Sequence, residues 1–105
     1  MTDLILVLTT VAADEQAEPL ARRLVEERLA ACVNLLPPMT SVFRWQGEVH
    51  RDTERQLIIK TTRERLPALQ NRLGELHPYE LPELLVLSVE GGGDAYLEWA
   101  RRAVR

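Results

Sequence analysis

Two short runs of this sequence are apolar on both faces of a strand, and this limits how the chain can fold. Residues 4–8 read LILVL and residues 84–87 read LLVL, which is typical of buried β-strands. Leu57, Ile58 and Ile59 form a third such segment. The helices of a chain of 105 residues cover one face of such a sheet. We therefore expect a second copy of the chain to cover the other face.

The first third of the chain predicts a strand, a helix and a second strand. Residues 4–10 predict the first strand. Asp14 is the expected N-cap of a helix whose apolar positions, from Ala17 to Leu29, recur at helical spacing. Pro19 is unfavourable inside a helix, so the regular helix should begin after Asp14. The segment AACVNLL predicts the second strand, which is interrupted by a bulge or break at Pro37 and Pro38 and resumes at residue 39.

The middle of the sequence predicts a long β-hairpin. Extended residues 39–45 are followed by QGE at 46–48, a turn signal, and by a returning strand that reaches residue 62. These two strands are longer than the other strands require. We expect the hairpin to extend beyond the rest of the subunit.

The last third predicts a helix, a buried strand and a closing helix. The second helix has leucines at helical spacing with Pro67 in its first turn. The strand covers residues 83–89. Asp94 is the expected cap of the closing helix, which runs from Ala95 to Val104. Four of its side chains share one stripe: Tyr96, Trp99, Ala100 and Ala103.

The order of these elements is β-α-β-β-α-β followed by a helix. This order predicts a single α+β domain over residues 1–105, with a ferredoxin-like antiparallel sheet and helices on one face.

Charge and composition exclude several classes of function. The net charge of −3 argues against nucleic acid or an anionic membrane as a partner. The first strand is followed by no glycine-containing phosphate cradle, which an acylphosphatase on this fold would need. The strands LILVLTT and QLIIKTT carry none of the aromatic residues of an RNA-binding domain. We therefore expect a protein that is not an enzyme.

The compartment is predicted from the N-terminus and the cysteine count. A signal peptide begins with basic residues, whereas this N-terminus carries the acidic Asp3. The apolar run after Asp3 is also too short for a signal peptide or a membrane span. Cys32 is the only cysteine, so the chain forms no internal disulfide. Both observations favour the reducing cytoplasm.

Four blocks of sequence, in this order, resemble the CutA family of divalent-cation tolerance proteins. They read ERLAACVNLLPPMTSVFRWQGEV, IIKTT, HPYELPELL and DAYLEWA. The resemblance implies a ferredoxin-like subunit in a homotrimer, with hairpins that reach neighbouring subunits, and an architecture similar to that of the PII signalling trimers. It also implies a response to copper or other divalent metal ions. The alternative is a PII-like trimer that binds a small ligand or acts as a scaffold.

The segment HPYELPELL contains the strongest candidate site. His77 precedes Pro78, which disfavours helical backbone at His77. One interpretation is a rigid corner between helix and strand, with local hydrogen bonds from His77 and Tyr79. The other is a metal site in a cleft between subunits, with His77, Tyr79 and Glu83 as ligands and Glu80 beside them.

The resemblance implies three positions for copper ligands: a cysteine in the first strand and two adjacent histidines before Pro-Tyr. The matching residues are Thr9, Leu76 and His77. Only His77 keeps a donor suited to copper, which argues against copper binding by this set.

The remaining candidates are weaker. Cys32 is either a small apolar residue of the second strand or a thiolate ligand for a soft metal. His50 is expected to be a solvated strand residue, and Trp45 to be buried at a subunit contact. Residues 91–93, three glycines before a helix, are expected to form a flexible turn rather than an anion site.

Overall fold

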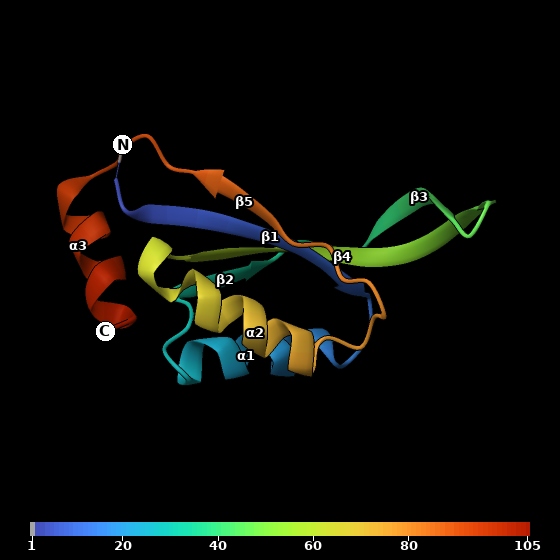
Figure 1. The fold of residues 1–105 in the computed structure, drawn as a ribbon, viewed down its shortest axis with the longest axis horizontal. Coiled ribbons are helices and arrows are strands. Elements are labelled where there is room, and N and C mark those ends of the chain that lie inside the picture. The colour runs from blue at the N-terminus through green and yellow to red at the C-terminus, as the bar shows by residue number, and fades with distance from the viewer. Residues whose placement is uncertain (1) are drawn as a thin grey trace.

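The computed structural model describes residues 2–105, which form a mixed α+β fold (Figure 1). In chain order the elements are β1 (Leu4–Ala12), α1 (Ala17–Glu26), β2 (Cys32–Leu35), β3 (Met39–Trp45), β4 (Glu48–Thr62), the short 3-10 helix η1 (Arg63–Arg65), α2 (Leu66–Leu76), β5 (Leu85–Ser88) and α3 (Asp94–Ala103). The α+β prediction and the predicted element order are confirmed. The second predicted strand is divided into β2 and β3.

Strand β4 organises the sheet. It pairs with β1 along one edge and with β2 and then β3 along the other, and β5 pairs with the far edge of β1. All of these pairings are antiparallel, as predicted. Because β1 and β2 both run antiparallel to β4, they run in the same direction. The connection from β1 through α1 to β2 therefore crosses over β4.

Helices α1 and α2 cover one face of the sheet, and α3 lies at the end near the N-terminus (Figure 1). Alternate residues of β1, among them Ile5 and Val7, point to the helices and are fully buried. They pack with Leu24 of α1 and Leu69 of α2 in the main core. A smaller cluster joins α3 to the sheet through Leu4, Ala31, Leu97, Ala100 and Val104.

The opposite face of the sheet carries apolar side chains that neither α1 nor α2 covers (Figure 1), and α3 packs only on its end, against Leu4. Leu6 pairs with Leu87, and Leu8 pairs with both Leu85 and Ile58, so these five side chains share the face. We call them the open face. Leu85 and Leu87 are 53% and 45% exposed. The strand predicted at 83–89 is present as β5 (Leu85–Ser88), but it is exposed rather than buried, because no helix among residues 2–105 covers it.

The hairpin of β3 and β4 projects from the body of the subunit (Figure 1). Before Glu54, β4 pairs with β3 alone. Gln46 and Gly47, at the predicted turn, have φ of 52° and 82°, which is the pattern of a type I′ turn. Val42 and Val49, near the tip, are 69% and 65% exposed. The long hairpin is confirmed, and its tip makes few contacts with its own subunit.

The two predicted helix caps have different outcomes. The regular helix α1 begins at Ala17, after Gln16, and Asp14 makes a capping contact ahead of it: its carboxylate accepts the amide of Gln16 and its carbonyl accepts the amide of Ala17. Gly93 is the N-cap of α3, and Asp94 is the first residue of that helix. The predicted cap of α3 is therefore wrong, because Gly93 rather than Asp94 has the extended backbone that precedes a helix. Leu29 is buried beyond the end of α1.

The predicted stripe of α3 is only partly correct. Ala100 is buried, but it packs with Leu97 and Val104. Tyr96 and Trp99 point away from the core and are 46% and 48% exposed.

Residues 2–105 contain no helix with the length and apolar character that a membrane crossing requires.

Candidate functional site

The corner after α2 is held by His77. Strand β5 pairs with β1 only as far as Leu8, and beyond this point the carbonyl of Thr10 lies 2.8 Å from His77 Nε2. The amide of Tyr79 donates to His77 Nδ1 at 3.1 Å. The local hydrogen bonds of the rigid-corner interpretation are therefore present. They fix the start of the segment that returns to the sheet.

These two contacts define the protonation of His77. A carbonyl only accepts a hydrogen bond and an amide only donates one, so the ring carries its proton on Nε2 and is neutral. Burial lowers the pKa of His77, against the opposing effects of the Thr10 carbonyl and the Glu54 carboxylate. Both ring nitrogens are thus occupied, and neither offers a free lone pair to a metal ion.

Tyr79 connects this corner to the hairpin. Its hydroxyl donates to Glu54 Oε2 at 2.7 Å, and its ring lies against the ring of His77 with 4.8 Å between centroids. Burial, followed by the hydrogen bond to Glu54, raises the pKa of Tyr79. The tyrosine is therefore a neutral donor to a carboxylate that is itself only 7% exposed.

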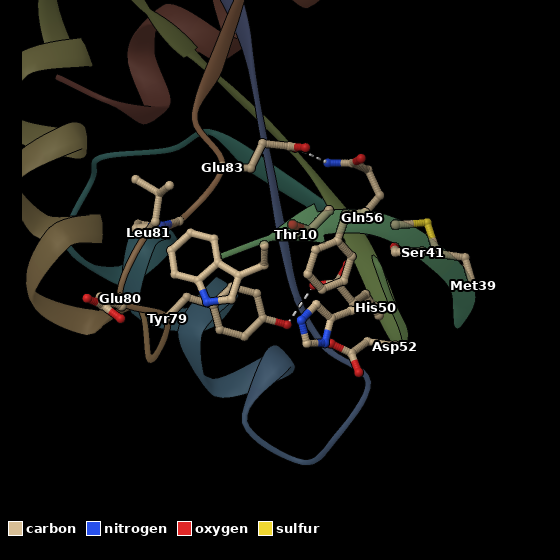
Figure 2. Close-up of a pocket in the computed structure, with 14 residues that line it drawn as sticks. Thr10, Met39, Ser41, His50, Asp52, Gln56, Tyr79, Glu80, Leu81 and Glu83 are labelled. Atoms are coloured by element: carbon tan, nitrogen blue, oxygen red, sulfur yellow. Dashed lines mark hydrogen bonds between the residues drawn. The ribbon is translucent and has the colours of Figure 1, made fainter. Parts of the chain in front are cut away.

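A cleft of about 750 Å³ lies between the hairpin and the segment that follows His77. Figure 2 shows the side chains that line it. Strand β3 contributes Met39, Ser41, Phe43 and Trp45, β4 contributes His50, Asp52, Glu54 and Gln56, β1 contributes Thr10, and the returning segment contributes residues 79–83. The alternating positions of β4 place these side chains on the same face as Ile58. The cleft is therefore continuous with the open face and is present in a single subunit.

The polar groups of the cleft are acidic or neutral. Four carboxylates line it, those of Asp52, Glu54, Glu80 and Glu83, whereas no arginine or lysine among residues 2–105 does. The side-chain amide of Gln56 donates to Glu83 at 3.0 Å (Figure 2). It also donates to the carbonyl of Thr9 at 2.7 Å. The cleft is therefore suited to a positively charged or polar guest.

The structure brings together only part of the predicted ligand set. Tyr79 and Glu83 line the cleft, and His77 lies behind Tyr79. Cys32 begins β2 and pairs with Lys60, and it is not part of the cleft lining. The metal roles of these residues stay predictions.

The cleft also contains residues for which the sequence predicted no functional role. His50 was expected to be simply solvated, but it lines the cleft and stacks on Phe43 with 5.7 Å between centroids. Trp45 also lines the cleft, whereas residues 91–93 connect β5 to α3. Glu54 and Gln56 were missed. Residues 50–56 are polar at every position, so no alternation in the sequence could have separated Glu54 and Gln56 from an ordinary solvated strand.

The residues at the positions implied for copper do not fit that metal. The hydroxyl of Thr9 is buried without a hydrogen-bond partner within the described chain. Leu76 has no donor atom, and His77 uses both nitrogens. Across residues 2–105, no three histidine, cysteine or acidic side chains are grouped so that they could hold a metal ion. The subunit contains no preformed metal centre in this region.

The fold and the site together define a small α+β protein with an acidic, aromatic-lined cleft at the base of a projecting hairpin. A family model described as "CutA1 divalent ion tolerance protein" matches residues 5–103. The chain belongs to this family, and the resemblance seen in the sequence is confirmed.

Individual relatives agree with this assignment. The divalent-cation tolerance protein CutA of Thermus thermophilus is 50% identical over 90% of this chain and 92% of its own length. The chloroplastic protein CutA of Arabidopsis thaliana is 43% identical over 96% of this chain, which spans 56% of that longer protein. A solved structure of the Thermus thermophilus protein superimposes with a TM-score of 0.92 at 47% identity, covering 97% of this chain and 99% of the other.

Proposed function

We propose that this chain forms a homotrimer that takes part in the response to divalent metal ions, including copper, without catalysing a reaction. The observation that carries the proposal is the acidic cleft beside an uncovered apolar face, in a family described by divalent ion tolerance. The apolar face supports self-association, and the cleft supports attraction of cations.

The subunit architecture is consistent with a ferredoxin-like fold. Strand β4 lies between two strands of the same direction, and two helices pack on one face of an antiparallel sheet. In the trimer the open face and the projecting hairpins are proposed to contact neighbouring subunits. The proposed location is the cytoplasm, because Cys32 is a lone cysteine.

Metal binding is proposed to be weak and electrostatic. The carboxylates of the cleft do not converge on one point: Figure 2 shows Glu80 pointing away from Glu83 and Asp52. Exchangeable sites of this kind bind divalent ions with dissociation constants of about 0.1–1 mM. Of the four predicted ligands, Glu83 is favoured, because its carboxylate lies in the cleft and is held only by an amide donor.

Calorimetric titration with Cu²⁺ and Zn²⁺ tests this proposal. We expect weak binding by the wild-type protein, weaker binding by Glu83→Gln, and unchanged binding by the control variant Glu26→Gln on the exposed face of α1. His77→Ala should leave the affinity unchanged, because both nitrogens of His77 are occupied. Tight stoichiometric binding that disappears in His77→Ala, or no binding at all, would overturn the proposed metal role.

A second candidate function is a PII-like trimer that binds a small ligand in the cleft. The observation that favours it is the size and lining of the cleft. Its volume of about 750 Å³ is within the range of small-molecule sites, which combine apolar walls with a few placed polar groups. A divalent ion alone would not use the aromatic walls.

A further inference from the structure

We propose that the cleft binds a small organic cation, a primary amine on an apolar body, with its ammonium group against Glu54. The inference rests on the second candidate function, ligand binding by the cleft, and names the chemical class of that ligand. It follows from the state of Glu54, from the walls of the cleft and from the arrangement of its other acids.

Glu54 is a buried carboxylate without a counter-ion. It is only 7% exposed, it lines the cleft, and no ion pair within residues 2–105 includes it. Its one side-chain hydrogen bond is the donation from Tyr79 to Oε2. A carboxylate accepts about four hydrogen bonds, and burying an unpaired charge is costly. Glu54 therefore has the capacity to accept further hydrogen bonds from a cationic donor in the cleft.

The walls around Glu54 are suited to an apolar body that carries the charge. Phe43, Trp45 and Tyr79 present aromatic rings, and Leu81 adds an aliphatic side chain that is 69% exposed. Aromatic faces attract ammonium groups as well as apolar groups. A ligand with a charged end and an apolar body would satisfy both parts of this lining.

The arrangement of the acids favours an organic cation over a bare metal ion. A divalent ion requires several oxygens at coordination distance around one point, and no such group of three is present among residues 2–105. Glu83 already accepts the amide of Gln56, and Glu80 points away from the other labelled acids (Figure 2). An ammonium group needs only one carboxylate and one or two further acceptors, which Glu54 supplies with its neighbours.

Calorimetric titration of the 105-residue chain with 2-phenylethylamine tests the proposal. The neutral 2-phenylethanol and the anionic phenylacetate have the same apolar body and serve as ligand controls, and Zn²⁺ alone serves as the metal control. Glu54→Gln keeps the volume and the acceptor for Tyr79 but removes the charge. Glu26→Gln is the matched control for loss of one acidic group on the surface.

We expect the amine to bind the wild-type protein and Glu26→Gln equally, and the alcohol and phenylacetate to bind much more weakly. Glu54→Gln should weaken amine binding by about thirtyfold or more, because a buried charge pair is lost. If Glu54→Gln does not fold, the inference is tested by comparing amine binding with alcohol binding to the wild-type protein. Leu81→Ser then provides a second variant, with weaker amine binding expected.

Equal binding of amine and alcohol, unchanged amine binding by Glu54→Gln, or absence of amine binding would each overturn the inference. The outcome is separable from the proposed function. A trimer that still binds divalent ions weakly but ignores the amine contradicts only this inference. A monomer without metal binding contradicts the proposed function instead.

Discussion

His77 is the residue that ties the corner after α2 to the end of β1. Its neutral ring accepts from Tyr79 and donates to Thr10, and protonation of Nδ1 would remove the first of these contacts. The sequence indicated the corner through the prolines that follow His77. It did not indicate the acceptor, because Thr10 is 67 residues away and is brought close only by the sheet.

The lowered pKa of His77 predicts a loss of stability in acid. Because its pKa in the folded protein lies below the ordinary value of 6.5, the unfolded chain takes up a proton at higher pH than the folded chain. The unfolded state therefore binds more protons below about pH 6.5, and the free energy of unfolding falls as the pH falls through this range. Above about pH 6.5, His77 does not change the free energy of unfolding with pH, because it is neutral in both states.

Urea unfolding at about pH 7.5 and about pH 5 measures this effect. The wild-type protein should lose more stability between the two values than His77→Gln, which has no group to protonate at this site. The acidic groups are the same in both proteins, so their effect on the loss of stability cancels in the comparison. An equal or larger loss in His77→Gln would contradict the assignment of a neutral, buried His77.

At the scale of elements, the hairpin turn is the feature with the clearest local cause. Gln46 and Gly47 both have positive φ, and the left-handed region costs a residue other than glycine about 1 kcal/mol. Asparagine tolerates this region better than glutamine and is favoured before glycine in type I′ turns.

Gln46→Asn should therefore raise the free energy of unfolding by about 0.5 kcal/mol, and Gly47→Ala should lower it by about 1 kcal/mol. Urea unfolding of the two variants provides the measurement. Gln70→Asn, on the exposed face of α2, is the matched control and should be neutral or slightly destabilising because asparagine is a poorer helix former. Destabilisation by Gln46→Asn would contradict the type I′ geometry.

Most elements could be predicted from the sequence because their signals are local. The apolar run of β1, the prolines before β3 and the turn at 46–48 each act on neighbouring residues. The cap of α3 was missed because Asp94 is a good capping residue, whereas the preceding Gly93 has the required extended backbone geometry. Residue type alone does not determine that geometry.

The composition of the cleft could be predicted only in part. Tyr79, Glu80 and Glu83 attracted attention because they are close in sequence. Glu54 and Gln56 lie more than twenty residues away, on a strand whose polar residues look like an ordinary solvated face. Only the turn of the hairpin and the corner at His77 together bring the two segments into contact.

At the scale of the whole molecule, the subunit is elongated, with extents of 45 × 26 × 24 Å. A body covered by helices on one face continues into a two-stranded hairpin (Figure 1). Such a ribbon is marginally stable alone, and each large aliphatic side chain left exposed forgoes about 1.5–3 kcal/mol of burial. The open face and the hairpin therefore both favour association with further copies of the chain.

The cleft lies at the junction of these two surfaces, since the face of β4 that bears Glu54 also bears Ile58. Association over the open face would therefore place neighbouring chains next to the cleft. Ligand binding and assembly are expected to influence each other for this reason, whether the ligand is a metal ion or an organic cation.

Sedimentation equilibrium at micromolar concentration tests the central claim, that the open face is buried by self-association. The wild-type protein should sediment with about three times the 12.0 kDa mass of the chain. Leu87→Lys should shift it toward the monomer, because a charge would be buried at the contact. Val25→Lys, at a comparably exposed position on α1, should leave the trimer intact. A wild-type protein that sediments as a stable monomer, or a Leu87→Lys variant that remains fully trimeric, would contradict the account.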